Sequence, residues 1–219
     1  MFIAVVPAYN EEKRIGSVVQ SLFGQVDRVV VVDDNSTDNT FAVAKSAGAI
    51  VLRHKINRGQ GAALQTGHDY SLENNAEHVL HFDGDGQFCV EDISPALEKL
   101  KETEADVLFG SRYLDNRTKI PWFKKHILFP VARIFNKIVG VKLSDIHNGF
   151  RILSRRALEN IKIEQDRMAH ATEIPAKVKK LGLKYVEFPV QVVYHEYGQG
   201  LSNGLQVVKD LIFGKFLKK

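Results

Sequence analysis

Two aspartates stand one residue apart in the segment "HFDGDGQF". In an extended backbone, the side chains of Asp83 and Asp85 point to the same side, because side chains alternate with a period of two. Two carboxylates on one side suit a hard divalent cation, and Gln87 adds a neutral oxygen one step further along. Gly84 leaves room for a phosphate group to approach. Considered alone, the segment is equally compatible with a plain Asp/Gly-rich turn.

The composition is that of a globular protein with one α/β domain. The chain has 219 residues, 44% hydrophobic and 26% charged, which is enough for a full core. The single cysteine, Cys89, excludes an internal disulfide and fits a reducing compartment. No apolar run approaches the roughly 18 residues of a membrane span. The N-terminal segment lacks the basic region and cleavage site of a signal peptide, so a first strand is expected there.

Five apolar, β-branched runs alternate with helix-like stretches. Strands are expected at 2–6, 28–32, 49–53, 78–82 and 106–110. Helices are expected at 11–23, 38–47, 60–72, 91–102 and near 169–181, and one or two further strands within 184–195. Strands that alternate with helices form parallel sheets covered on both faces. The sequence therefore predicts an α/β fold with a mostly parallel central sheet.

A polar segment follows each of the five apolar runs. These segments are "PAYNEE", "DDNSTD", "NRGQG", "DGDGQ" and "GSR". In a parallel sheet, ligands bind beyond the carboxyl ends of the strands. We therefore expect the five segments to form one binding site.

Several residues in these segments have two interpretations. Asp33 or Asp34 ends the second strand and can accept hydrogen bonds from a ribose or a base, whereas Asp38 fits a helix N-cap. The segment "NRGQGAALQTG" lacks the third glycine of a dinucleotide fingerprint and follows the third strand, so an NAD site is not expected. Gly61 either contacts phosphate at a helix N-terminus or simply packs closely.

Two arginines and one glutamate complete the candidates. Arg112 follows the fifth strand, and Arg151 lies beyond an expected turn. Either guanidinium can neutralise a phosphate, and an ordinary surface position is the alternative for each. Glu173 lies on an expected helix, where an acid is usually solvated.

The order of these motifs resembles that of family 2 glycosyltransferases. "VVPAYNEE", "VVVDDNSTDNT", "NRGQGAALQTG", "DGDGQ", "GSRY" and "NGFRILSRRAL" carry the resemblance, which extends over about residues 2–195. The most similar groups are the dolichyl-phosphate mannose synthases and the bacterial polyprenyl-phosphate glycosyltransferases. The resemblance implies one GT-A domain over 1–219, with a nucleotide-sugar-binding half at 1–112 and an acceptor-side half at 113–219. It also implies inversion at the anomeric carbon.

The resemblance assigns roles on the donor side. Asp83 is implied to lie near the donor sugar and ribose, and Asp85 and Gln87 to hold Mg²⁺ or Mn²⁺. A cation there offsets the charge that builds on a departing diphosphate and so lowers the barrier. The donor pocket is implied to include Pro7, Ala8, Tyr9, Glu11, Asp34, Gly61, Asp83 and Gly84.

On the acceptor side, the resemblance leaves two chemistries open. Arg112 and Arg151 are the expected additional countercharges for phosphate groups. A lipid-phosphate acceptor is already anionic and needs no general base. A sugar-hydroxyl acceptor, as in polysaccharide assembly, must lose a proton, and Glu173 is then the candidate base.

Basic amphipathic helices are expected in the C-terminal half. Residues 119–142 form either a core helix pair or helices lying on a membrane, and the "NGLQVVKDLIFGKFLKK" tail repeats the pattern. The side chains expected to face lipid are Trp122, Phe123, Ile127, Leu128, Phe129, Ile134 and Phe135, with Lys124, Lys125, Arg133 and Lys137 facing headgroups. We favour peripheral contact with the inner face of the cytoplasmic membrane, either alone or with a membrane-protein partner.

Other readings of the sequence are less well supported. The "R-x-x-G-x-S-K" segment of the similar enzymes is replaced here by "YHEYGQGLSNG" at 194–204, which weakens the lipid-phosphate assignment. A nucleotidyltransferase is disfavoured, because acids rather than a basic Gly-rich signature follow the first strand. The intact "DGDGQ" argues against an inactive nucleotide-sugar-binding module. No nucleic-acid partner is expected.

Overall fold

The structure is a computed structural model that describes residues 1–118 and 140–193. The predicted membrane-facing segment lies outside the described residues except for 140–142, and so does the C-terminal tail.

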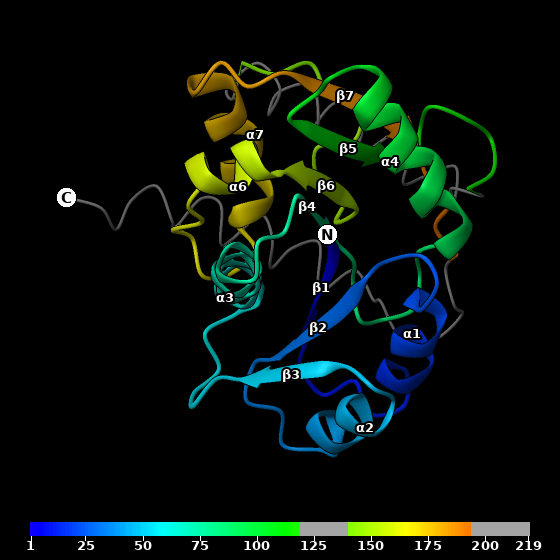
Figure 1. Ribbon diagram of the computed structural model, residues 1–219, viewed down its shortest axis with the longest axis vertical. Coiled ribbons are helices and arrows are strands. Elements are labelled where there is room, and N and C mark those ends of the chain that lie inside the picture. Colours follow the sequence, from blue (N-terminus) through cyan, green and yellow to red (C-terminus); the bar gives the residue numbers. More distant parts are fainter. Residues whose placement is uncertain (119–139, 194–219) are drawn as a thin grey trace, which may run out of the picture.

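A central β-sheet runs through the described residues (Figure 1). Its strands are β1 (Phe2–Ala8), β2 (Arg28–Asp33), β3 (Ile50–Arg53), β4 (His78–His81), β5 (Val107–Ser111), β6 (Arg151–Ser154) and β7 (Tyr185–Pro189). The order across the 7-stranded sheet is β3-β2-β1-β4-β6-β5-β7. β6 runs antiparallel to both of its neighbours, and the other pairs are parallel. The prediction of a mostly parallel sheet is confirmed.

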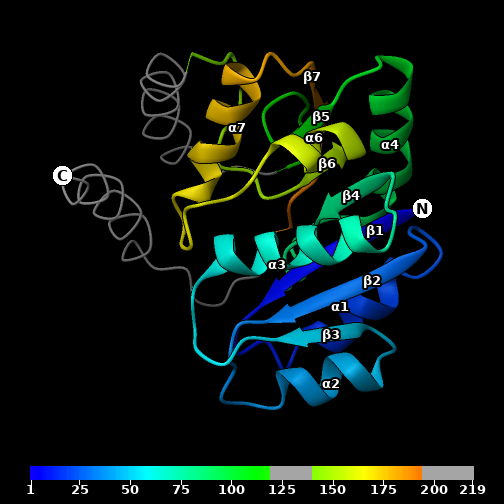
Figure 2. The same ribbon diagram turned by 60° about the vertical axis from the view of Figure 1, so that its left-hand side comes forward.

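Helices cover both faces of this sheet (Figures 1 and 2). They are α1 (Ile15–Leu22), α2 (Thr40–Ser46), α3 (Gln60–Glu73), η1 (Val90–Asp92), α4 (Ile93–Glu102), α6 (Arg155–Asn160) and α7 (His170–Lys180). The hydrophobic cluster on one face includes residues of α1, α2 and α4. The cluster on the other face includes residues of α3, α6 and α7. The result is a three-layer α/β/α domain.

The central strand β1 shows why its sequence lacks polar alternation. Every residue of β1 is buried. Ile3 and Val5 pack into the cluster beneath α3, whereas Ala4 and Val6 pack into the cluster beneath α1. Successive side chains of a strand point to opposite faces, so a strand covered on both sides needs apolar residues throughout.

The five predicted strands and their intervening helices are present, with ends shifted by a few residues. Strand β6 was not predicted. It has 4 residues and begins with Arg151, so it resembled the continuation of a turn. Its pairing with β4 and β5 depends on contacts far apart in the sequence.

The strand order places a crevice beside β1. From β1 the chain passes to β2 and β3 on one side, whereas β4 pairs with the opposite edge of β1. Connections that leave neighbouring strands in opposite directions open a gap at their carboxyl ends, where ligands of such sheets bind. The segments that follow β1 and β4 therefore face each other across this gap.

Candidate active site

A cavity of about 580 Å³ opens at the carboxyl ends of β1 and β4. It is lined by Pro7, Ala8, Tyr9, Glu11, Asp34, Asn57, Gly59, Gln60, Ala63, Asp83, Gly84, Asp85, Arg167 and Met168. Most residues predicted for the donor pocket thus lie together. The predicted site residues that do not line it are Gly61, Gln87, Arg112, Arg151 and Glu173.

Asp83 lies half-buried in the cavity wall, two residues after the end of β4. The side-chain amide of Gln60 donates a hydrogen bond of 2.8 Å to its Oδ1. Burial and, to a smaller extent, the neighbouring charge of Asp85 raise the pKa of Asp83 to about 7, against the opposite influence of Arg151 and Arg112. The protein therefore holds this carboxylate where its negative charge is unfavourable without an added cation.

Asp85 is positioned by a local turn. The backbone N–H of Gln87 donates to Asp85 Oδ1 at 3.0 Å, the pattern of an Asx turn. Gln87 is itself fixed by the N–H of Val193, which donates to its carbonyl oxygen at 2.9 Å. Burial raises the pKa of Glu11, and the charge of Asp85 adds to that effect. With Asp83 and Asp34, four carboxylates thus line one cavity.

These groups fit a magnesium or manganese ion. Among the described residues, no group of three or more His, Cys, Asp or Glu side chains is arranged to hold a metal. Mg²⁺ in nucleotide enzymes typically takes one or two carboxylates and completes its octahedron with substrate phosphates and water. The Asp83–Asp85 pair and its mutual repulsion agree with that pattern.

Gly149 is a site residue that sequence reasoning missed. A Cβ added to it would stand 3.0 Å from Cγ of Asp83 and overlap one of its carboxylate oxygens. A glycine is therefore needed for Asp83 to keep its place. The only sequence signal was a glycine in the "NGFR" motif, and nothing in the sequence linked it to Asp83.

Asp34 lines the cavity, but its carboxylate is already engaged. It is 3% exposed. The backbone N–H groups of Arg58 and Gly59 donate to it at 2.9 and 2.6 Å, and His54 Nδ1 lies 2.7 Å from Oδ1. Asp34 thereby holds the loop before α3 against the end of β2. The role of this carboxylate at the cavity is therefore structural.

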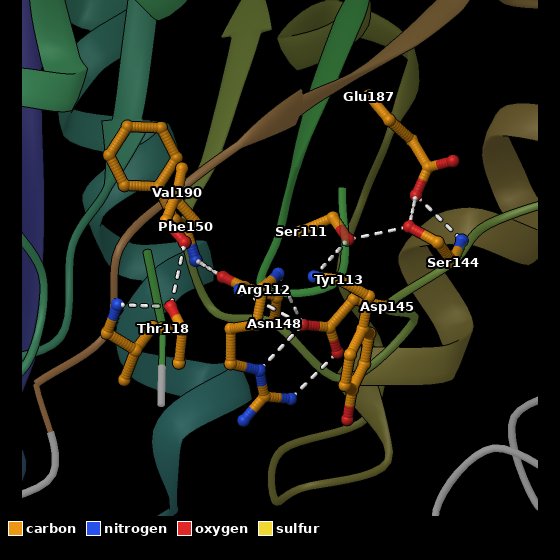
Figure 3. Close-up of polar contacts among 11 residues, drawn as sticks. Ser111, Arg112, Tyr113, Thr118, Ser144, Asp145, Asn148, Phe150, Glu187 and Val190 are labelled. Atoms are coloured by element: carbon orange, nitrogen blue, oxygen red, sulfur yellow. Dashed lines mark hydrogen bonds and ion pairs between the residues drawn. The ribbon is translucent and has the colours of Figure 1, made fainter. Parts of the chain in front are cut away.

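Arg112 is locked to Asp145, as Figure 3 shows. Its Nε and Nη2 donate to the two carboxylate oxygens of Asp145 at 2.6 and 2.7 Å, and its backbone N–H donates at 3.1 Å. Asn148 adds a longer bond of 3.3 Å to the same carboxylate. Asp145 is 4% exposed, so the guanidinium is held in one orientation by a buried acid. Sequence reasoning named Arg112 but missed Asp145 and Asn148.

A second carboxylate supports this cluster from β7. Ser144 donates to Glu187 Oε1 through its backbone N–H and its hydroxyl, both at 2.7 Å (Figure 3). The Ser144 hydroxyl also lies 2.6 Å from that of Ser111 at the end of β5. The segment that carries Asp145 is therefore tied to two strands.

Arg151 is buried beneath the site. Its side chain is 1% exposed, and Nη2 donates a long 3.4 Å bond to the carbonyl oxygen of Ala171. Nε and Nη1 have no hydrogen-bond partner among the described residues. Burial lowers the pKa of Arg151 to about 10, while Asp83 and Asp145 oppose that shift. This position does not fit the expected direct contact with phosphate, because the guanidinium acts from inside the protein.

Glu173 and Gly61 have structural roles. The backbone N–H groups of Glu164 and Gln165 donate to the two oxygens of Glu173, both at 2.9 Å, and Lys177 lies 2.8 Å from it. A carboxylate so engaged does not fit the expected general base. For Gly61, a Cβ would overlap the carbonyl oxygen of Gln165, so close packing is the interpretation that applies.

Comparison with known proteins identifies the family. The model of "Glycosyl transferase family 2" matches residues 3–162. The chain belongs to this family. As a family 2 glycosyltransferase it is a transferase, and the predicted resemblance is confirmed.

Relatives match this family 2 chain over nearly its whole length. A Methanococcus voltae protein named UDP-N-acetylglucosamine–dolichyl-phosphate N-acetylglucosaminyltransferase is 27% identical, with 93% of this chain and 90% of the relative covered. The polyprenol monophosphomannose synthase of Mycolicibacterium smegmatis is 27% identical, with 94% and 82% covered. An uncharacterised protein of Methanocaldococcus jannaschii, MJ1222, is 35% identical over 96% of this chain and 90% of its own.

Solved structures confirm the GT-A fold. Glucosyl-3-phosphoglycerate synthase from Mycobacterium tuberculosis, crystallised with Mg²⁺ and UDP, superposes with a TM-score of 0.75 at 20% identity. The match covers 97% of this family 2 chain and 76% of the other. The same synthase has also been crystallised with Mn²⁺, UDP and glucosyl-3-phosphoglycerate. None of the described helices of the present chain has the length and apolar character needed to cross a bilayer.

Proposed function

We propose that this family 2 enzyme moves a sugar, with inversion, from a UDP- or GDP-linked donor to a polyprenyl phosphate in a metal-dependent reaction. The observation that carries the proposal is the cavity where the ends of β1 and β4 bring Asp83 and Asp85 together with the predicted donor residues. Relatives that cover most of the chain are named for transfer to dolichyl phosphate and for polyprenol monophosphomannose synthesis, which supports the acceptor class.

The donor is proposed to lie across the switch point of the sheet. The nucleoside occupies the side formed by Tyr9 and the loop that Asp34 holds, and the diphosphate faces Asp85. Asp83, fixed by Gln60, contacts the ribose or sugar hydroxyls. Asp85 and Gln87 would hold a divalent cation, which would supply positive charge for the departing diphosphate.

The acceptor oxygen is proposed to attack directly. A lipid phosphate is anionic near neutral pH, so its oxygen forms the new bond to the anomeric carbon while the bond to the diphosphate breaks. No proton has to be removed, which agrees with Glu173 being engaged by backbone donors. Arg112, held by Asp145, provides a fixed positive charge within electrostatic range of Asp83. It is the proposed countercharge for the reacting phosphates.

The location follows from the acceptor. A polyprenyl phosphate resides in a membrane, so we propose a cytoplasmic enzyme in peripheral contact with the inner face. The segment predicted to make that contact, 119–142, is the first region to test by vesicle binding.

A transfer assay tests the proposal. The purified chain is incubated with UDP- and GDP-sugars and polyprenyl phosphate, with and without Mn²⁺, and the glycolipid product is measured. We expect product that requires both lipid and metal. Turnover that ignores the lipid would favour a hydroxyl acceptor instead, and full activity after exhaustive chelation would contradict the metal assignment.

A matched pair of variants locates the metal. Asp85→Asn should lower transfer by at least about 100-fold, because a neutral amide binds a hard cation much more weakly than a carboxylate does. Asp69→Asn is the control, since Asp69 is an exposed carboxylate on α3 that accepts a bond from Gln65. Near-normal activity of Asp85→Asn would contradict the proposal that Asp85 holds the metal.

A further inference from the structure

The segment between α6 and α7 forms one wall of the donor cavity. Arg167 and Met168 line the cavity, although the match to the family model ends at residue 162. Figure 2 shows this connection descending beside the start of α3. The wall therefore comes from a part of the chain outside the matched family region.

The wall is closely docked on the N-terminus of α3. The N–H of Ala62 donates to the carbonyl oxygen of Asp166 at 3.0 Å. A Cβ on Gly59 would stand 2.7 Å from that same oxygen, and one on Gly61 would overlap the oxygen of Gln165. The two glycines of "NRGQG" thus allow the wall to approach α3.

Helix α7 fixes the other side of the wall. Glu173 accepts the backbone N–H groups of Glu164 and Gln165, both at 2.9 Å. Lys177, one turn further along, pairs with Glu173 at 2.8 Å and Glu164 at 2.9 Å, and also donates to the carbonyl oxygen of Lys162. Held from two sides, the segment presents Arg167 from a fixed backbone.

The charge of Arg167 stands out in the cavity. Among the described residues that line it, Arg167 is the only lysine or arginine, and the charged residues around it are the acids Glu11, Asp34, Asp83 and Asp85. Its side chain is exposed, so it reaches a ligand without being desolvated first. A guanidinium binds phosphate or carboxylate through two parallel hydrogen bonds.

We propose that Arg167 is a donor-binding residue that pairs with an anionic oxygen of the sugar nucleotide. This inference rests on the proposed function. The oxygen belongs either to the diphosphate, common to all donors, or to the carboxylate of an acidic sugar, which would make the enzyme selective for uronate donors. The diphosphate and the carboxylate both offer anionic oxygens to a guanidinium, and binding measurements distinguish them.

The test compares ligands that differ in charge. Dissociation constants for uridine, UDP, UDP-glucose and UDP-glucuronate are measured by calorimetry with Mn²⁺ present, or with the guanine counterparts, including GDP-mannose and GDP-mannuronate, if GDP binds in place of UDP. The variants are Arg167→Gln and Arg167→Lys. Arg156→Gln removes the same charge from an exposed position on α6 and is the matched control.

Each outcome has a defined meaning. If Arg167 pairs with the diphosphate, Arg167→Gln raises the dissociation constant of UDP about tenfold and leaves that of uridine unchanged. If Arg167 pairs with a sugar carboxylate, the dissociation constant of UDP-glucuronate rises about tenfold and those of the other ligands stay unchanged. Arg167→Lys keeps the positive charge and therefore loses less affinity than Arg167→Gln. Arg156→Gln binds every ligand as tightly as the wild type does. Equal affinities for every ligand in wild type and Arg167→Gln would overturn the inference, whereas failure of the wild type to bind UDP and GDP would overturn the proposed function.

Discussion

Asp83 and Asp145 are carboxylates at the same edge of the sheet, but they meet opposite surroundings. Asp83 stands beside Asp85, and burial together with that charge raises its pKa to about 7. Asp145 is more deeply buried, yet it receives the fork of Arg112, the N–H of the same residue and the amide of Asn148.

The contrast distinguishes residues proposed to bind a ligand from residues that support the fold. The proposed donor side keeps a repulsion between Asp83 and Asp85 that the proposed cation would relieve, whereas Arg112, Asp145 and Asn148 satisfy one another's charges and hydrogen bonds. Residues held for a ligand commonly reduce the stability of the empty protein. Substitutions that remove charge should therefore stabilise the donor side and destabilise the Asp145 cluster.

The largest expected effect is on the folding of Asp145→Asn. This change leaves the charge of Arg112, whose side chain is 19% exposed, without its buried partner. We expect the free energy of unfolding to fall by about 3 kcal/mol, since breaking a buried ion pair strands one charge. Urea denaturation measures the loss.

The control for this change is Asp115→Asn. Asp115 pairs with Arg117 at 2.6 Å, but both side chains are substantially exposed, at 26% and 41%. An exposed pair contributes about 1 kcal/mol or less. Equal losses in the two variants would show that the Asp145 pair has no special importance.

Gly149→Ala should separate activity from stability. The added Cβ overlaps the carboxylate of Asp83 and forces it to move. Displacing a group in a reacting site costs about 100-fold in rate, or about 2.7 kcal/mol. The transfer assay measures this loss, and calorimetric unfolding should show a much smaller change. Normal transfer would mean that Asp83 needs no fixed position.

Most residues of the cavity could be predicted from the sequence because the signals for them are local. β1 and β4 are apolar runs, and a residue placed directly after such a strand, such as Asp83, must lie at its carboxyl end. The Asp145 cluster could not be predicted in this way. Asp145 meets Arg112 across 33 residues, and β6 pairs antiparallel with strands distant in the chain.

Buried charged side chains were also not predicted correctly from the sequence. Arg151 was expected either to neutralise a phosphate or to lie on the surface, yet it begins a buried strand. Glu173 was treated as a solvated acid or a base, but it accepts backbone donors from a loop that no helical pattern indicates. Such partners become known only when the chain is folded.

Asp83→Asn should stabilise the metal-free protein. In the folded state the pKa of Asp83 is about 7, above its ordinary value of 3.8, so its favourable contribution is lost as pH rises from about 4 to 7. Because the side chain is partly solvated, we expect a gain of about 1–2 kcal/mol at pH 8 in EDTA.

The pH dependence of that gain is the check. The difference between Asp83→Asn and wild type should shrink as pH falls from 8 towards 4, measured by urea denaturation at each pH. Buried His68, whose pKa is lowered to about 3, destabilises both proteins below pH 6.5 and cancels from the difference. A difference that does not vary with pH would mean that the repulsion at Asp83 is not the cause.

Glu187→Gln is expected to have the smallest effect and defines the limit of the supporting cluster. The amide oxygen can still accept both bonds from Ser144, so only the charge assistance is lost. We expect a loss of about 1 kcal/mol in unfolding free energy, with Glu98→Gln on the exposed face of α4 as an unchanged control. If Glu187→Gln were instead as destabilising as Asp145→Asn, the negative charge on β7 would itself be part of the lock on Arg112, and the two carboxylates would form one cooperative unit. A double variant whose loss is smaller than the sum of the two single losses would establish that coupling.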